Sequence, residues 1–206
     1  MLVRAIVIAA SAAALLAGCV PLLPSFYVGD ESAGRYSYNS CSLGTIPEGL
    51  EVSRAGIVLL VSVSQWREDE VVHVRYDIGK GHRVQLANHE VVVDARDGSA
   101  PRFGSIDWID LWDRVREDGY EGLLARRAGM RSPDLLMDDS QLPPLPTGPR
   151  PLLPVRHYWV ATHVNTGHAD RVWVQLPDLM VDGVPVAFPE IRFNRRSRLV
   201  LAPLNC

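Results

Sequence analysis

The residues that could take part in chemistry do not fall into a complete enzyme motif. A Gly-x-Ser-x-Gly elbow, which exposes the nucleophile of many hydrolases, is absent from the sequence. His89-Glu90 begins the pattern of a zinc-protease helix, but Val93 stands where the second histidine is required. The motifs therefore identify no catalytic residue, and the question of an enzyme stays open, with a non-catalytic role favoured.

The six histidines also lack the spacing of metal ligands. His157 and His163 fall on one face of a predicted strand, but six residues at about 3.3 Å each place them about 20 Å apart, too far to share an ion. His82 and His89 flank one short strand and could meet other ligands only through tertiary contacts. We therefore expect histidines that are exposed or hydrogen-bonded on sheet surfaces, with no metal and no cofactor.

The acidic residues are grouped without the pattern of a cation site. Asp107, Asp110 and Asp113 recur every three residues, whereas a calcium loop needs oxygen ligands at alternate positions with a central glycine and a final glutamate. A solvated helical face explains this spacing better. A pair of carboxylates for glycoside cleavage could come from any of the acids, and the sequence does not select one.

Two tryptophans are the remaining candidates for a functional surface. Trp159 shares a strand face with His157 and His163, opposite a face rich in valine, and Trp173 is likewise out of phase with the valines around it. If the valine faces form the core, both indoles lie on partly exposed surfaces, where aromatic patches often mark contacts with proteins or ligands. The alternative is that these strands are buried on both faces or covered by a helix.

The elements that must position these residues are mostly strands. Apolar runs alternate with turn signals every eight to twelve residues, which is typical of antiparallel sheet. The expected strands are 57–64, 71–78, 82–87, 90–95, 155–166, 171–176, 179–181, 184–188, 191–193 and 198–201. The first four, joined by short loops, are expected to form a meander, and Asp182-Gly183 predicts a tight hairpin turn.

An insertion at 96–154 is expected to interrupt these strands. Within it, the apolar spacing predicts an amphipathic helix over 107–118 and a second short helix over 121–128. The proline-rich stretch 143–154 should run extended over the surface. The fold class is therefore mainly β: an antiparallel β-sandwich, with immunoglobulin-like topology as one option and a short helical and Pro-rich insertion.

The N-terminus has the pattern of an export signal. One basic residue within Met1–Arg4 precedes an apolar run over 5–17. As a helix, this run would reach about 20 Å, short of the ~30 Å hydrocarbon core of a bilayer. A permanent transmembrane helix is therefore not expected.

Leu16-Ala17-Gly18-Cys19 resembles the lipobox of bacterial lipoproteins. The resemblance implies that 1–18 is a removed signal peptide and that Cys19 carries the lipid, with several acyl chains, palmitate among them, that anchor it stably to a membrane. It also implies a lipid anchor and spacer over 19–34. No aspartate follows the cysteine, which points to the outer membrane, facing the periplasm. The alternative is an ordinary secretory signal with an incidental cysteine.

If Cys19 is acylated, two cysteines remain in an oxidising compartment. Cys41 and Cys206 could then form one disulfide, which would join the end of the chain to its first strand region. The alternative is two unpaired thiols. The rest of the chain, 35–206, is of a size to form one domain.

The net charge of the chain bears on the kind of partner it could bind. Without 1–18, which holds one arginine, 20 basic residues face 24 acidic ones, a formal charge of −4, and this does not favour a nucleic-acid partner. We therefore expect a membrane-anchored envelope lipoprotein that acts as a binding or structural module for an envelope protein or cell-wall component. The alternative is a periplasmic hydrolase or metal-handling protein whose site is formed by the 96–154 insertion.

Overall fold

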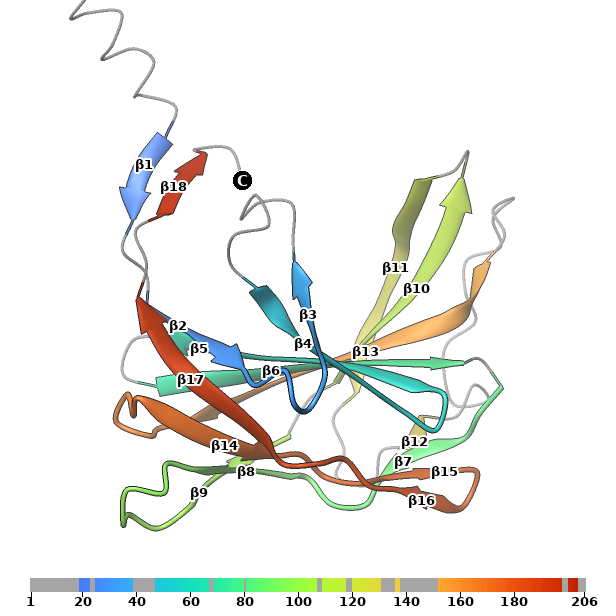
Figure 1. The fold of residues 1–206 in the computed structure, drawn as a ribbon. Helices are drawn as coiled ribbons and strands as arrows, with labels where there is room; N and C mark the ends of the chain where they lie inside the picture. The colour runs from blue at the N-terminus through green and yellow to red at the C-terminus, as the bar shows by residue number, and fades with distance from the viewer. Residues whose placement is uncertain are drawn as a thin grey trace, which may run out of the picture.

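A computed structural model describes residues 19–22, 25–38, 47–66, 69–79, 81–106, 109–117, 120–130, 136–137, 152–197 and 200–203. Every regular element in these ranges is a β-strand (Figure 1). The described ranges accordingly hold no helix that could cross a bilayer. All strand pairs are antiparallel, and the chain forms the sandwich expected from its period-two patterns.

The strands, in chain order, are β1 (Cys19–Leu22), β2 (Ser25–Gly29), β3 (Arg35–Tyr38), β4 (Pro47–Arg54), β5 (Ile57–Trp66), β6 (Asp69–Gly79), β7 (Val84–Leu86), β8 (Glu90–Asp94), β9 (Arg102–Ser105), β10 (Ile109–Glu117), β11 (Tyr120–Met130), β12 (Leu136–Met137), β13 (Leu152–Val164), β14 (Arg171–Gln175), β15 (Leu179–Val181), β16 (Val184–Val186), β17 (Ile191–Ser197) and β18 (Val200–Pro203).

One layer is a seven-stranded sheet in the order β11-β10-β13-β6-β5-β4-β3. The strands β3 to β6 form a local meander, whereas β6 pairs on its other side with β13, about 80 residues further along the chain. The long register of β6 with β13, from Gly79↔Val155 to Glu70↔Val164, makes this pair the centre of the layer. We call this layer the large sheet.

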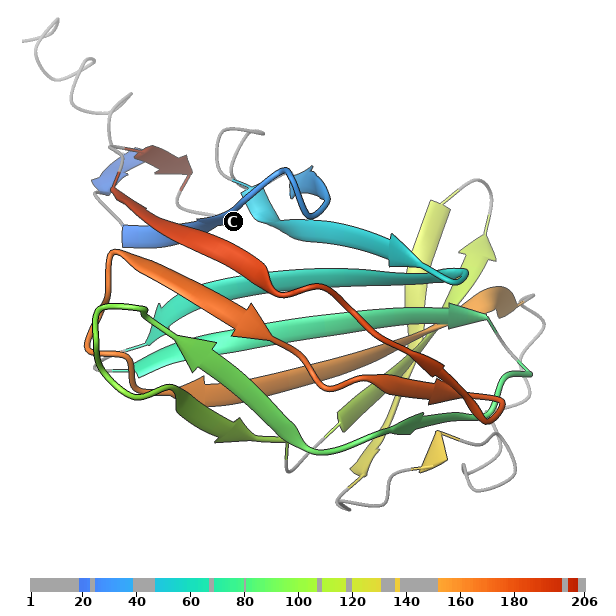
Figure 2. The same ribbon diagram turned by 60° about the horizontal axis from the view of Figure 1, so that its bottom comes forward.

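The second layer consists of two sheets placed end to end, β2-β17-β14-β8-β9 and β12-β7-β15-β16. The chain passes directly from β7 to β8, from β14 to β15 and from β16 to β17, so three long strands are each interrupted once (Figure 2). Pro177 and Pro189 lie in two of the interruptions, where a residue without an N–H cannot continue a ladder. The backbone N–H of Ala87 donates to the Asp178 carbonyl (2.8 Å) and holds the layer together across the break.

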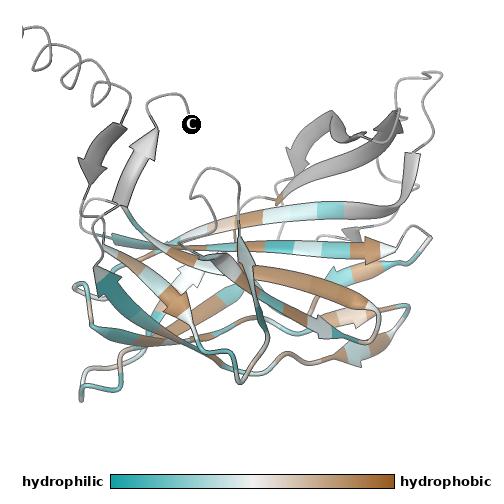
Figure 3. Ribbon diagram, turned by 45° about the horizontal axis from the view of Figure 1, so that its top comes forward, coloured by the Kyte–Doolittle hydropathy of each residue, from teal (hydrophilic) through white to brown (hydrophobic). Residues whose placement is uncertain are grey.

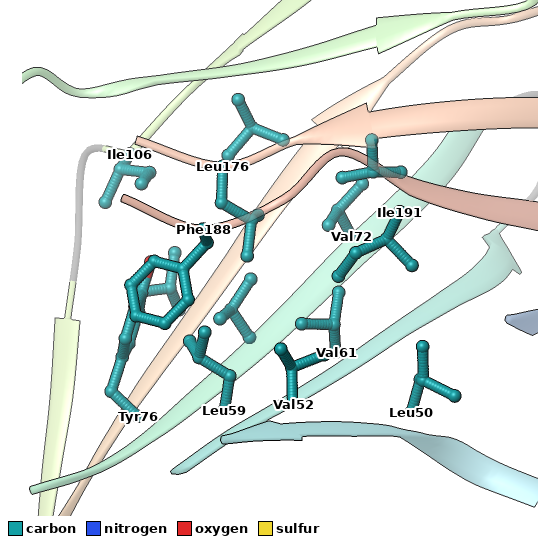
Figure 4. Packing of buried hydrophobic residues seen from close by; sticks show 14 of the residues in the cluster. Leu50, Val52, Leu59, Val61, Val72, Tyr76, Ile106, Leu176, Phe188 and Ile191 are labelled. Carbon is teal, nitrogen blue, oxygen red and sulfur yellow. The ribbon is translucent and has the colours of Figure 1, made fainter. Parts of the chain in front are cut away.

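The core lies between the two layers, because alternate residues of each strand point inward. Figure 3 shows hydrophobic and hydrophilic residues interleaved along the strands of the sandwich. Figure 4 shows the inward side chains of both layers meeting, with Leu59, Val61 and Val72 of the large sheet facing Phe188 and Ile191 of the other layer. Each such side chain contributes about 1.5–3 kcal/mol by leaving water.

The strand β9 closes one side of the sandwich by packing closely on β13. Gly104 of β9 lies so near β13 that an added Cβ would fall 2.6 Å from Oγ1 of Thr162. The Thr162 hydroxyl donates to the Ser105 carbonyl (2.8 Å). A side chain larger than hydrogen cannot be accommodated at Gly104 without displacing the Thr162 and Val164 side chains or one of the two strands.

The two ends of the described chain lie together. The strand β1 pairs with β18 in a register that places Cys19 opposite Pro203, and β2 then pairs with β17, placing Ser25 opposite Ser197. The domain therefore begins and finishes at the same end of the sandwich (Figure 1).

The two predicted helices are wrong. The segment expected as helix 107–118 contains β10, and the segment expected as helix 121–128 lies within β11, which pairs with β10 as a hairpin. Pairing with β13 decides the outcome, since tertiary contacts routinely override a short helical pattern. The segment expected as an insertion thus supplies strands to both layers.

The predicted meander of four strands is also wrong, because after β6 the chain crosses to the other layer instead of returning beside it. The strand order also differs from the four-plus-three arrangement of immunoglobulin constant domains. The proline-rich prediction for 143–151 lies outside the described residues. Pro154, by contrast, lies within β13 where the ladder with β10 shifts register, a position that proline tolerates.

Candidate functional site

The four residues expected on a binding surface divide between the two outer faces of the sandwich. His157, Trp159 and His163 lie on the outer face of the large sheet, since the alternate residues of β13, Tyr158, Val160 and Thr162, are buried in the core. Trp173 lies on the outer face of the other layer, between the buried Val172 and Val174. They therefore form two separate surfaces, one on each side of the molecule.

On the large sheet, His157 lies against Asp77, the residue directly opposite it on β6. Nδ1 of His157 is in hydrogen-bond contact with Oδ1 of Asp77. Arg75 donates from Nε to Oδ1 (2.9 Å) and from an Nη atom to Oδ2 (3.0 Å) of the same carboxylate. The Arg75 guanidinium lies 5.6 Å from the ring centre of Trp159. One carboxylate thus fixes an imidazole and, through an arginine, an indole.

The other nitrogen of this imidazole is unpaired. The His157 side chain is only 4% exposed, and its Nε2 has no hydrogen-bond partner among the described residues. In the neutral imidazole with Nδ1–H donating to Asp77, Nε2 is the acceptor. A carboxylate that orients an imidazole in this way is the arrangement that prepares a histidine to accept a proton or bind a metal ion.

A second polar pair lies on the same face. Oγ of Ser64 on β5 lies 3.0 Å from Nε2 of His73 on β6. Burial, assisted by the charge of nearby His163, lowers the pKa of His73, so its imidazole is neutral at pH 7. Within the described ranges no cluster of three or more His, Cys, Asp or Glu side chains is placed to hold a metal ion.

The alternation of polar and apolar residues over 71–78 places His73, Arg75 and Asp77 on one face of that strand, but it does not connect them with His157. The connection depends on the register of β6 against β13. Strand alternation assigns a face to each residue, but it gives no information about which strand lies alongside.

On the opposite side of the sandwich, Trp173 lies between arginines. The guanidinium of Arg96 lies 4.4 Å from the indole ring centre, and that of Arg171 lies 5.9 Å from it. Arg96 is also ion-paired with Glu190. These contacts fix the indole at the surface, where it is half-buried.

A shallow hollow of about 440 Å³ opens beside this indole. We call it the Trp173 hollow; its lining residues are Asp30, Ser32, Ala33, Trp173, Glu190 and Arg192. Arg192 forms an ion pair with Asp30 across it. The backbone N–H of Ser32 donates to Oδ1 of Asp30 (3.0 Å), and this bond, with a smaller contribution from Arg192, lowers the pKa of the Asp30 carboxyl.

Arg96 adopts a backbone conformation that is unusual for its residue type. Its φ is +51°, in the left-handed region that non-glycine residues rarely enter. Its N–H donates to Oδ1 of Asp94 (2.7 Å), which stabilises the turn. The strained turn directs the Arg96 side chain over Trp173 and towards Glu190, and strain of this kind is concentrated at functional sites.

A buried carboxylate lies at the end of the sandwich where the chain begins and finishes. Glu70 of β6 is fully buried and accepts hydrogen bonds from the Tyr27 hydroxyl (3.2 Å), Nδ1 of His168 (2.9 Å) and the backbone N–H of Thr166 (3.0 Å). The single hydroxyl hydrogen of Tyr27 is shared with the Ala169 carbonyl (2.8 Å). These bonds hold the β13–β14 loop, in which His168 has a φ of +60°. No sequence signal identified Glu70 as buried.

The cysteines are described only in part. Cys19 begins β1, whereas Cys41 and Cys206, the predicted disulfide partners, lie outside the described residues. Comparison of the whole chain with protein families, with curated proteins and with solved structures finds no match.

Proposed function

We propose that this chain is a lipoprotein of the bacterial cell envelope, anchored through Cys19 to the outer membrane and facing the periplasm, where its sandwich acts as a non-catalytic binding module. The N-terminal support is the lipobox Leu16-Ala17-Gly18-Cys19. Ser25, the first residue of β2, follows Cys19 by six residues, a reach of at most about 20 Å. The sandwich is therefore held close to the membrane surface.

The observation that carries the binding role is a pair of arginine-stacked tryptophans on the outer faces. Trp159 and Trp173 are each half-buried. The arginines that stack on them, Arg75 and Arg96, are held in place by ion pairs. Tryptophan and arginine are the residue types most enriched at binding hot spots, and a side chain that is already ordered loses little entropy on binding. The partner expected for such surfaces is an envelope protein or a cell-wall component.

The anchor is tested by labelling cells with radioactive palmitate and separating membrane from soluble fractions. Wild-type protein should carry the label and sediment with the outer membrane, and Cys19→Ser should lose the label and the processing step. Lipid labelling of the Cys19→Ser protein would exclude this anchor.

The binding role is tested by photo-crosslinking in intact cells. A photoreactive phenylalanine analogue at Ala161, an exposed position between Trp159 and His163, should capture a discrete partner. The same analogue at Val184, which is exposed on the β15–β16 hairpin, is the matched control. Equal capture at both positions would show that the outer face of the large sheet is not a specific interface.

A second function, that of a periplasmic hydrolase or metal-handling protein with a site that involves 96–154, is favoured by Nε2 of His157, which is buried without a hydrogen-bond partner among the described residues. The imidazole is oriented by Asp77 and lies on the strand next to β10 of that segment. Metal analysis of protein purified without chelator tests this function. One metal ion per chain that is lost in His157→Ala would replace the binding module as the preferred function.

A further inference from the structure

We propose that the Trp173 hollow is a binding site for a neutral saccharide. This inference rests on the proposed binding function and assigns a ligand class to one of its two surfaces.

The charged groups around the hollow cancel one another. Arg192 is ion-paired with Asp30, and Arg96 with Glu190 and, at 4.0 Å, with Asp94. With Arg171, which lies against Trp173, three guanidinium groups balance three carboxylates. A charged ligand would therefore be repelled by one member of each ion pair while it is attracted by the other. A hydroxyl group, in contrast, can donate to a carboxylate and accept from a guanidinium at the same time, and a ligand with several hydroxyls can use both pairs.

The indole supplies the apolar contact that a sugar ring needs. A pyranose with equatorial hydroxyls, such as β-glucose, presents axial C–H groups on its ring faces, and these pack on the electron-rich face of an aromatic ring. Trp173 lines the hollow next to Glu190 and Arg192. An aromatic ring with carboxylate and guanidinium groups beside it matches a ligand whose ring face is apolar and whose edge carries hydroxyl groups.

Size and pre-organisation agree with this ligand class. A hollow of about 440 Å³ lies in the range of small-molecule sites, about 300–1,000 Å³. Its polar side chains are held before any ligand arrives, since Asp30 accepts from the backbone of Ser32 and Arg96 is fixed by its strained turn. The main-chain N–H of Asp30 also donates to the Arg192 carbonyl (2.8 Å), which locks the two walls together.

Titration calorimetry on the full lipoprotein, purified in detergent, tests the proposal with three tetrasaccharides. Chitotetraose and maltotetraose are neutral, and a sulfated heparin tetrasaccharide is anionic. At least one neutral sugar should bind with a Kd of about 1 mM or tighter. Trp173→Ala should weaken that binding at least tenfold, and Glu190→Ala, which leaves the indole in place, should also weaken it.

Trp159→Ala is the matched control, because it removes an arginine-stacked indole from the other face of the sandwich. It should leave saccharide binding unchanged. The proposal is overturned if neither neutral sugar binds, if the sulfated sugar binds more tightly than both, or if Glu190→Ala and folded Trp173→Ala protein bind as well as wild type. Saccharide binding by a protein that is not labelled with palmitate would support the saccharide site and exclude the lipid anchor. Palmitate labelling of a protein that binds no saccharide would support the anchor and exclude the saccharide site.

Discussion

Replacing Glu70 with glutamine should lower the free energy of unfolding by about 3 kcal/mol, because the buried carboxylate satisfies three donors that one amide cannot. Oε1 accepts from Tyr27 and His168, and Oε2 accepts from the Thr166 N–H. Glutamine keeps one oxygen and turns an N–H₂ group towards the remaining donors. The loss combines a hydrogen bond to a charged group, about 1.5–3 kcal/mol, with an unsatisfied donor, about 1–3 kcal/mol.

The pH dependence gives this prediction a second signature. Burial alone would raise the pKa of Glu70, but the hydrogen bonds from Thr166, His168 and Tyr27 outweigh it and hold the pKa below its ordinary value of 4.5. A carboxyl group whose pKa is lower in the folded than in the unfolded protein stabilises the fold at pH values above its unfolded-state pKa. This stabilisation is lost as the pH falls through its folded-state pKa. The difference between wild type and Glu70→Gln should therefore be constant above about pH 5 and shrink at lower pH.

Urea unfolding followed by circular dichroism at several pH values measures both effects. Glu51→Gln is the matched control, since Glu51 pairs with Arg35, whose side chain is 80% exposed, and exposed pairs contribute about 0–1 kcal/mol. A Glu70→Gln protein as stable as Glu51→Gln, or a stability difference that does not change down to pH 3, would refute the role assigned to the buried carboxylate.

Three further outcomes follow from packing and covalent chemistry. Gly104→Val should destabilise the fold by at least about 2 kcal/mol, measured by thermal unfolding, because its Cβ would overlap Thr162. Tyr76→Phe should keep or raise the melting temperature, since the Tyr76 hydroxyl is buried and has no partner among the described residues, and a stability loss above about 1 kcal/mol would show a missed contact. Thiol titration of the denatured mature protein without reductant should find Cys41 and Cys206 blocked as a disulfide, whereas two free thiols per chain would exclude the bridge.

The sequence alone predicts most strands of the sandwich and which face of each strand is buried. The alternation over 71–78 corresponds to β6, and the valine phase of 155–166 correctly buries Tyr158 and Val160 while leaving Trp159 half-exposed. His157 is the exception on its face, because it is almost completely buried. Period-two patterns are reliable here because each strand has one face against the core.

Strand partners and the segment 107–128 could not be predicted in the same way. Trp108, Leu111, Trp112 and Val115 have helical spacing, yet Ile109, Leu111 and Val115 are also an even number apart and fit a strand equally well. Pairing with β13 resolves the ambiguity, and such long-range pairing leaves no local signal. For the same reason, the sequence alone does not predict the contact of Asp77 with His157 or the contacts of Glu70 with the β13–β14 loop.

The pairing of β2 with β17 has a consequence for the order in which the molecule folds. Residues 25–29 find their partners only at 193–197, so this edge of the second layer cannot close until nearly the whole chain is available. The β3–β6 meander depends on neighbours in sequence and can form early. A chain that emerges from its N-terminus therefore carries the open edge of β2 throughout synthesis, and shielding that edge is a task for chaperones before β17 is available.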